Sequence, residues 1–258
     1  MSKQNGMMKR LAKLGLALLL GSTLSACSSS MQWKEEVKLH DGQVVVAERY
    51  YTLGGFAYLD SRERTPLEET VTFNLPDNKS IVWKNDFRDS VPEPNSLNHF
   101  RFDVVSGIPY LATYPAGCIA YNKWGRPNPP QVLFKYEDRQ WKRITLDELP
   151  QGLIGATANV IVGRPASSLL KSFYTVAGVN DKNRPISTPE YKTILREASG
   201  IAGGPGSNCP EMIRTGDGGW SGIGWFRRQP TYEACLKYCE REEVTTQNCP
   251  CNRLFKGK

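Results

Sequence analysis

Few residues in this chain have the types and spacing that acid–base or nucleophilic chemistry requires. His40 is followed by Asp41, and an imidazole beside a carboxylate can act as an acid–base pair. The next residue is Gly42, however, and an Asp-Gly step between two strand-like runs is typical of a hairpin turn. Ser221 lies in Gly-Trp-Ser-Gly-Ile, which lacks the second glycine of a nucleophile elbow. We therefore predict that the protein is not an enzyme and uses no cofactor.

The remaining candidates for catalysis are weaker. The glycine-rich stretch 200–206 lacks the Lys-Ser/Thr of a phosphate-binding loop. Acidic residues are adjacent at positions 35–36, 68–69 and 242–243. Neighbouring side chains on a strand face opposite ways, so we expect these acids to be solvated rather than to form a catalytic pair. The alternative is an envelope hydrolase or glycan-processing enzyme whose site the sequence does not reveal.

The N-terminus has the pattern of a bacterial secretion signal. Four cations and no acid precede an apolar run at 14–20, and small residues follow it. The run is shorter than the roughly 18 residues that a membrane-spanning helix needs. It leads into Leu-Ser-Ala-Cys, which resembles the lipobox of bacterial lipoproteins. The resemblance implies that residues 1–26 are a signal peptide and that the thiol of Cys27 is acylated.

The same resemblance implies a location for the protein. Residues 27–32 would form the acylated N-terminus and a polar tether, with palmitate among the acyl chains, so the protein would be anchored to a membrane without spanning it. Ser28 stands where an aspartate would retain a lipoprotein at the inner membrane. The expected location is therefore the cell outer membrane, facing the periplasm.

The basic balance of the full sequence comes partly from the signal. The formal net charge is +7, and removal of the four signal cations leaves 29 cationic against 26 acidic side chains, a net charge of +3. A nucleic-acid-binding surface needs clustered cations, which the sequence does not show. We predict no nucleic-acid partner.

The cysteines other than Cys27 indicate an oxidising compartment. Six remain, an even number that is typical of three disulfides in an exported chain, although fifteen connectivities are possible. A metal site is the alternative, but the chain has only two histidines, His40 and His99, and neither lies near the four cysteines at 235–251 in the sequence. We therefore predict disulfides and no metal. The six residues are Cys118, Cys209, Cys235, Cys239, Cys249 and Cys251.

Four of these cysteines follow a recognisable pattern. Thr231 can cap a helix that carries Cys235 and Cys239 one turn apart on one face. Cys249 and Cys251 are two apart, as on one face of an extended segment. The pattern resembles the cystine-stabilised helix–strand motif of small secreted proteins. This resemblance implies the bridges Cys235–Cys249 and Cys239–Cys251, and it leaves Cys118 with Cys209.

Short β-type runs separated by turn residues dominate the first part of the mature chain, and they predict four hairpins. The paired runs are 33–39 with 43–51, 71–75 with 81–84, 102–105 with 110–114, and 132–136 with 141–145. The expected fold is mainly β, or α+β overall, with an antiparallel hairpin meander that forms a sandwich, a barrel or a curved sheet. A small helical, disulfide-braced unit is expected at the C-terminus.

A change of character near residue 150 divides the mature chain into two expected regions. Residues 33–150 form a β-hairpin domain, and residues 151–258 a mixed α/β region that contains the disulfides. In the second region we expect a strand at 160–162, a short helix within 165–176 and a helix from 189 to 198 that Thr188 caps.

Two loops present residues that are common at protein interfaces. Trp124 and Arg126 lie in a proline-rich loop at 121–130, and Trp225 and Arg227 lie among glycines. Rigid loops with tryptophan and arginine bind at a low entropic cost. The alternative is that both tryptophans cover the core and both arginines pair locally.

The stretch from Cys118 through this proline-rich loop, together with Trp33-Lys34-Glu35-Glu36-Val37 and its Asp-Gly turn, is similar to proteobacterial envelope lipoproteins. In design and location the chain also resembles the lipoprotein immunity proteins that neutralise phospholipase effectors of the type VI secretion system. These resemblances imply a lipid-anchored protein-binding module whose partner is an effector toxin or an envelope component. An accessory role in envelope assembly is a further possibility.

Overall fold

The computed structural model describes residues 29–55, 63–75, 77, 79–87, 96–197 and 209–255. Cys27 lies outside these residues. The strands are β1 Ser29–Lys38, β2 Val44–Gly54, β3 Thr65–Asn74, β4 Ser80–Asp86, β5 Leu97–Val105, β6 Ile108–Pro115, β7 Val132–Glu137, β8 Gln140–Ile144, β9 Phe173–Tyr174, β10 Met212–Arg214 and β11 Trp220–Gly222. The α-helices are α2 Cys118–Lys123, α3 Val176–Asn183, α4 Ile223–Arg227, α5 Tyr232–Arg241 and α6 Cys251–Phe255.

The four predicted hairpins are confirmed, and the fold is mainly β. Strand β1 pairs antiparallel with β2, β3 with β4, β5 with β6, and β7 with β8. The strand orders are β4-β3-β2-β1-β9 and β5-β6-β7-β8, and over the described residues neither sheet closes into a barrel. The predicted Asp-Gly turn joins β1 to β2, where Gly42 has a φ of 89°.

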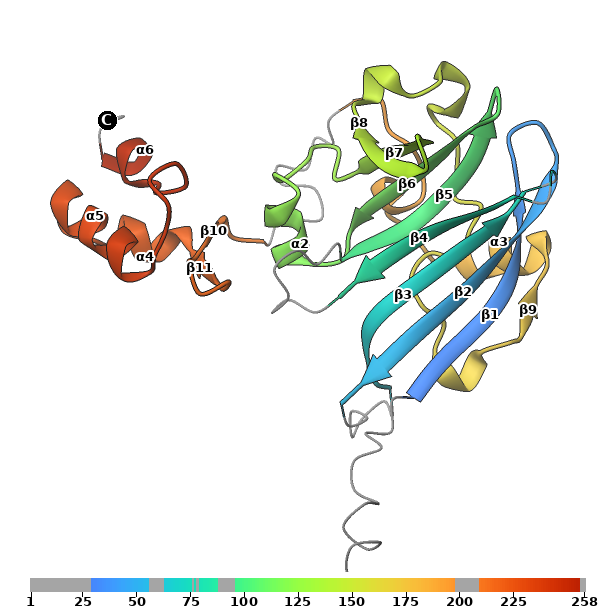
Figure 1. The fold of residues 1–258 in the computed structure, drawn as a ribbon, viewed down its shortest axis with the longest axis horizontal. Coiled ribbons are helices and arrows are strands. Elements are labelled where there is room, and N and C mark those ends of the chain that lie inside the picture. Colours follow the sequence, from blue (N-terminus) through green and yellow to red (C-terminus); the bar gives the residue numbers. More distant parts are fainter. Residues whose placement is uncertain are drawn as a thin grey trace, which may run out of the picture.

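A buried side chain connects the two sheets. The amide of Asn85, on β4, accepts a hydrogen bond from the backbone N–H of Leu97 at 3.1 Å and donates to the carbonyl of the same residue. It thereby takes the place of a backbone ladder between β4 and β5. Figure 1 shows these two strands side by side, so the eight long strands form one curved array.

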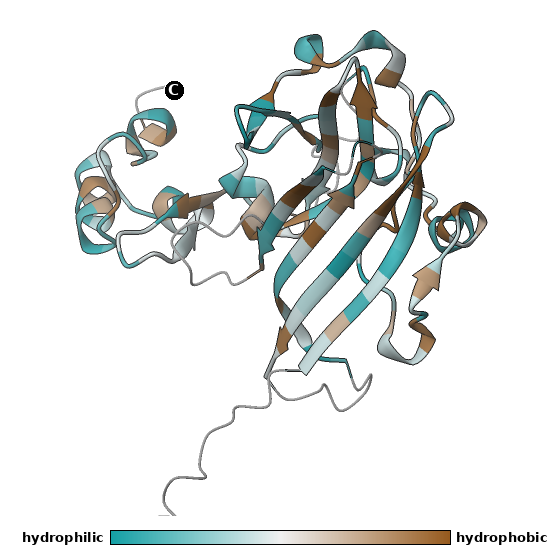
Figure 2. Ribbon diagram, turned by 45° about the vertical axis from the view of Figure 1, so that its right-hand side comes forward, coloured by the Kyte–Doolittle hydropathy of each residue, from teal (hydrophilic) through white to brown (hydrophobic). Residues whose placement is uncertain are grey.

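Alternation along the strands builds the main core. Buried residues recur at every second position along β1, β2 and β4 and in the second half of β3, and the inward hydrophobic residues pack against β5, β6 and β7. Figure 2 shows hydrophobic residues interspersed with hydrophilic ones in the sheets. The rings of Phe73 and Phe102 stack here with their centroids 3.8 Å apart. The other face of β5 and β6 is also buried, because Leu153 and Ile194 pack on Phe100. Residues 151–197 thus pack onto the sheets, and the expected boundary near residue 150 falls inside this body.

The three elements expected between residues 160 and 198 differ in the structure. Residues 160–162 are not a strand, because buried side chains satisfy their backbone: Glu35 accepts from the N–H of Ile161 at 3.2 Å, and Asn183 accepts from that of Val162 at 3.0 Å. The expected helix within 165–176 is a 3₁₀ turn, Ser167–Leu169, followed by β9. That segment is extended because β9 pairs with β1.

The expected helix from 189 to 198 is one 3₁₀ turn, Pro189–Tyr191. It ends there because Thr193 forms a β-bridge with Thr157, which requires extended backbone. Ala198 lies outside the described residues.

The C-terminal unit, residues 209–255, has its own core of helices and cystines. The predicted cap is confirmed, since the Thr231 hydroxyl accepts from the N–H of Ala234 at 3.1 Å. The disulfide between Cys118 and Cys209 is also confirmed. The other two expected bridges, Cys235–Cys249 and Cys239–Cys251, are wrong. The structure instead pairs Cys235 with Cys251 and Cys239 with Cys249. Cys251 begins helix α6 instead of a strand, so the helix–strand geometry is absent.

Two further observations concern the membrane. Residues 29–32, expected in the tether, are instead the beginning of β1 and pair with β2. Within the described parts of the chain, none of the helices has the length and apolar character that a membrane crossing demands.

Candidate functional site

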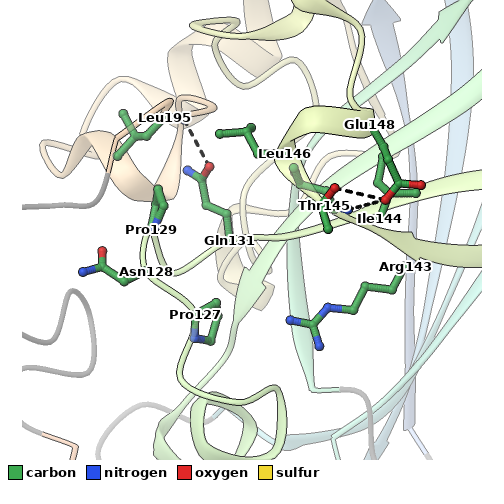
Figure 3. Close-up of a pocket in the computed structure, with 11 residues that line it drawn as sticks. Pro127, Asn128, Pro129, Gln131, Arg143, Ile144, Thr145, Leu146, Glu148 and Leu195 are labelled. Atoms are coloured by element: carbon green, nitrogen blue, oxygen red, sulfur yellow. Dashed lines mark hydrogen bonds between the residues drawn. The ribbon is translucent and has the colours of Figure 1, made fainter.

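A pocket with a volume of about 390 Å³ lies beside the proline-rich loop. Its walls come from the segment between α2 and β7, from the end of β8 and from the 3₁₀ turn Leu146–Glu148 (Figure 3). Leu133 and Ile144 are buried at its floor, and Leu146 and Leu195 add apolar surface. The pocket therefore combines an apolar floor with a polar rim.

Gln131 fixes one wall of the pocket. Its amide nitrogen donates to the carbonyls of Glu190 at 3.0 Å and Thr193 at 2.6 Å, and its amide oxygen accepts from the N–H of Leu195 at 3.1 Å. All three bonds join the proline-rich loop to residues 190–195, which include Ile194 of the core around Phe100. This wall is pre-formed, which lowers the entropic cost of binding.

The cation of the rim is Arg143, on β8. Its guanidinium lies over the ring of Trp124, 5.4 Å from the centroid, and donates to the Trp124 carbonyl at 3.2 Å. Figure 3 shows the side chain extending toward Pro127 at the open side of the pocket. Arg143 is exposed, so its free N–H groups can meet a carboxylate or an amide of a partner.

The anion of the rim is Glu148. Together with Thr145 it forms a capping box: its carboxylate accepts from the backbone N–H of Thr145 at 2.8 Å and from the Thr145 hydroxyl at 3.1 Å. These bonds hold the pKa of Glu148 below its usual value, so it remains ionised at neutral pH.

The predicted binding residues are distributed over two surfaces. Trp124 does not line the pocket itself; it lies beneath Arg143, which does, and it packs edge-on against Phe134 with the ring centroids 5.7 Å apart. Arg126 points to the C-terminal unit, where it donates to the carbonyls of Cys209 at 3.2 Å and Pro210 at 3.3 Å. These hydrogen bonds of Arg126 join the loop to the C-terminal unit next to the Cys118–Cys209 disulfide.

Trp225 and Arg227 lie apart from this pocket, on helix α4 of the C-terminal unit. Trp225 is 56 % exposed, and the guanidinium of Arg228 lies 5.3 Å from its ring centroid. Arg227 is also exposed. Trp225 and Arg227 thus belong to a second exposed surface, which carries an aromatic ring and cations and is separate from the pocket.

Sequence reasoning missed three of the pocket's polar residues, Gln131, Arg143 and Glu148. The Thr145-x-x-Glu148 spacing is a capping-box signal that could have been found. Arg143 has no local signal, because its role depends on the proximity of Trp124, nineteen residues earlier.

Another cavity, of about 360 Å³, lies between the β1–β2 turn and the β5–β6 turn, and His40 lines it. The partner of His40 is not Asp41 but Asp103, on β5: their Nδ1 and Oδ1 atoms are 2.7 Å apart. Asp103 is buried and also forms an ion pair with Arg101. The adjacent Asp41 instead accepts from the backbone N–H of Gln43 at 2.9 Å.

Four titratable side chains form a buried cluster on the inner face of the sheets. Arg49 lies between Glu35 and Glu69, with a 2.8 Å bond from Nε to Glu69 Oε1 and a 3.5 Å contact from Nη1 to Glu35 Oε1. His99 is the fourth member, with Nδ1 3.5 Å from Glu69. The expectation of solvated acids is thus wrong for Glu35 and Glu69. Alternation turns one acid of each pair inward, and Arg49 lies between the two buried carboxylates, closer to Glu69 than to Glu35.

Burial acts on each member of this cluster. It raises the pKa of Glu35, and Arg49 offsets this effect only in part. It also acts to raise the pKa of Glu69, but Arg49 and His99 outweigh it and hold that pKa below its usual value. Burial lowers the pKa of His99 to about 4.

The cysteine sulfurs of the C-terminal unit come close enough to resemble a metal site. Atoms of Cys239, Cys249 and Cys251 lie within 4.8 Å of one another. Each is already bonded in a disulfide, and a metal ligand would have to be a thiolate.

Comparisons of the chain with protein-family models, with curated proteins and with solved structures find no match.

Proposed function

We propose that the protein is a lipid-anchored lipoprotein of the cell envelope that binds another protein at the Trp124–Arg143 pocket. This pocket is defined by Gln131, Arg143, Glu148 and their apolar floor, and Trp124 supports it from beneath Arg143. The observation that carries this proposal is the exposed guanidinium of Arg143, stacked on Trp124 at the mouth of a pre-formed apolar pocket. Tryptophan and arginine are enriched among residues that dominate binding energy at interfaces.

The chemistry of the pocket indicates what kind of segment would enter it. The Arg143 guanidinium would donate to a carboxylate or an amide oxygen of the partner, the Glu148 carboxylate would accept from a donor, and an apolar side chain would pack on the floor. The volume of about 390 Å³ is enough for a few side chains of a loop or an extended segment. Among partners we favour a secreted antibacterial phospholipase effector, with a component of the envelope as the other possibility.

Replacing Cys27 by alanine is expected to move the protein from the membrane fraction to the soluble periplasmic fraction, because the body carries no helix that spans a membrane over its described residues. The measurement is fractionation followed by mass spectrometry of the mature N-terminus. Continued sedimentation of the alanine variant with membranes would contradict the anchor.

Reversal of the rim cation should weaken partner binding. Arg143→Glu is expected to cost about 2 kcal/mol, or about 30-fold in Kd, since it removes a stacked cation and places a like charge near Glu148. The probes are the products of the genes adjacent to this one, titrated against the full chain. Arg139→Glu, the same charge change on the exposed β7–β8 turn, is the matched control and should leave Kd unchanged. Equal effects of the two variants, or no binding among these products, would count against the proposal.

One observation favours a second function. The His40–Asp103 pair has the geometry of an acid–base dyad and borders a cavity, as a hydrolase of the envelope would require. If the protein hydrolyses envelope lipids or glycans, His40→Gln should abolish turnover while Arg143→Glu leaves it intact. Turnover that both variants retain would exclude the dyad.

A further inference from the structure

The first strand begins very close to the proposed anchor. Only Ser28 stands between Cys27 and Ser29, the first residue of β1. Two residues of extended chain span about 7 Å at most. An acylated Cys27 therefore holds the beginning of β1 at the surface of the bilayer, without a long tether.

The segment beside this end of β1 presents apolar side chains to the solvent. Strand β9 runs parallel to β1, with Phe173 opposite Lys34, so the residues before Phe173 lie toward the beginning of β1. Figure 1 shows the 3₁₀ turn Ser167–Leu169 beside that end. Leu169 is 62 % exposed and Phe173 is 44 % exposed, whereas Leu170 packs inward.

The exposed side chains are held outward by a fixed backbone. The hydroxyl of Tyr174 accepts from the N–H of Lys171 at 3.0 Å and donates to the carbonyl of Leu169 at 3.3 Å. Ser167 is fixed in turn by Glu63, which accepts from its N–H at 2.8 Å. The segment therefore cannot fold Leu169 into the core without losing these bonds.

A cation completes the surface. Lys171 is exposed between the two apolar residues, and within the described chain it forms no ion pair. A lysine beside exposed leucine and phenylalanine is the composition with which peripheral segments meet the phosphates and the acyl boundary of a bilayer.

We propose that Leu169, Lys171 and Phe173 form an anchor-proximal surface that rests on the membrane. This inference depends on the proposed acylation of Cys27. Leu169 and Phe173 enter the boundary between headgroups and acyl chains, and Lys171 contacts lipid phosphate. Because Phe173 is opposite Lys34, five residues along β1 from Ser29, the β9 edge of the sheet leans onto the bilayer and the long strands are inclined to it. Because the strands alternate in direction, the β1–β2 and β5–β6 turns lie at the opposite end, away from the membrane.

The test uses the mature full chain, purified from bacterial envelopes and mixed with vesicles of phosphatidylethanolamine and phosphatidylglycerol. Leu169→Cys carries an environment-sensitive fluorophore, and Phe173→Cys provides a second position. Ile108→Cys is the matched control, an exposed apolar residue at the β5–β6 turn. We expect blue-shifted emission at 169 and 173, and quenching by headgroup-labelled lipid several-fold stronger than at 108.

Three results would overturn the inference, and they are distinguishable. Equal quenching at 169 and 108, with the protein floating with the vesicles, leaves the anchor intact and removes the surface contact. A blue shift that appears without lipid and grows with protein concentration assigns the surface to a second copy of the chain. A protein that does not float with vesicles refutes the acylated anchor itself.

Discussion

Replacement of Arg49 by methionine should lower the free energy of unfolding by about 3–5 kcal/mol. The side chain is fully buried and makes four kinds of contact: to Glu69, to Glu35, to the Tyr51 hydroxyl at 3.0 Å and to the Ile161 carbonyl at 2.6 Å. Without Arg49, two carboxylates remain in the core with no opposite charge beside them.

The loss of stability should come mainly from the two buried carboxylates left without a cation, and less from the missing contacts of Arg49. Breaking a buried ion pair by removing one partner leaves an uncompensated charge, which is the costly case. Burial already raises the pKa of Glu35 with Arg49 present. A triple variant, Arg49→Met with Glu35→Gln and Glu69→Gln, removes the charges together and should recover a large part of the stability.

Lys34→Met is the matched control for this experiment. Lys34 forms an ion pair with Glu48 at 3.0 Å, and both side chains are about half exposed. Removing such a surface cation should change stability by less than about 1 kcal/mol. Urea unfolding followed by tryptophan fluorescence measures both variants. An Arg49→Met loss no larger than that of Lys34→Met would contradict the buried-charge account.

The hairpins could be predicted from the sequence, because each depends on a few turn residues between two strand-like runs. The Asp-Gly step at 41–42 fixes the first turn, and alternating residues fix the faces of the flanking strands. The connection between β4 and β5 could not be predicted. It depends on the hydrogen bonds between the Asn85 side chain and the backbone of Leu97. The sequence does not distinguish such a buried asparagine from one on the surface.

The buried cluster shows the limit of pattern reasoning in another way. Alternation correctly separates Glu35 from Glu36, but it does not say that the inward face of β1 can hold a carboxylate. That depends on Arg49 of β2 and on the backbone of Ile161, more than a hundred residues away. Likewise, the spacing of Cys249 and Cys251 fits either pairing, and the choice follows from helix α6.

The site was predictable only in its loop. The type and position of Trp124 point to an interaction surface, yet the guanidinium that lies over its ring is that of Arg143 and not that of Arg126. Arg126 bonds to residues more than eighty positions later, across a disulfide. Both assignments are set by contacts between distant segments, which a single sequence does not record.

The free energy of unfolding should fall by roughly 3 kcal/mol between pH 7 and pH 4 through His99 alone. Burial lowers the pKa of this imidazole from its ordinary value of 6.5 to about 4. Over the described residues neither ring nitrogen has a hydrogen-bond partner, so the 3.5 Å approach to Glu69 is not a hydrogen bond. The attraction of Glu69 is consequently weaker than the effect of burial.

The sign follows from proton binding. Between pH 6.5 and 4 the unfolded chain protonates this histidine and the folded protein does not, so acid favours unfolding. Glu69 acts in the same direction at lower pH, since its pKa is held below 4.5 in the folded protein. Glu35 acts in the opposite direction, because its raised pKa lets the folded protein keep a proton above pH 4.5.

His99→Leu isolates the contribution of the imidazole from those of the two acids. The neutral ring forms no hydrogen bond among the described residues, so the variant should be close to wild type at pH 7. At pH 4 it should be the more stable protein by roughly 3 kcal/mol, measured by urea unfolding at each pH. His40→Leu tests the chain's other histidine in the same way. If His40→Leu removes this pH dependence and His99→Leu does not, the assignment to the buried cluster is wrong.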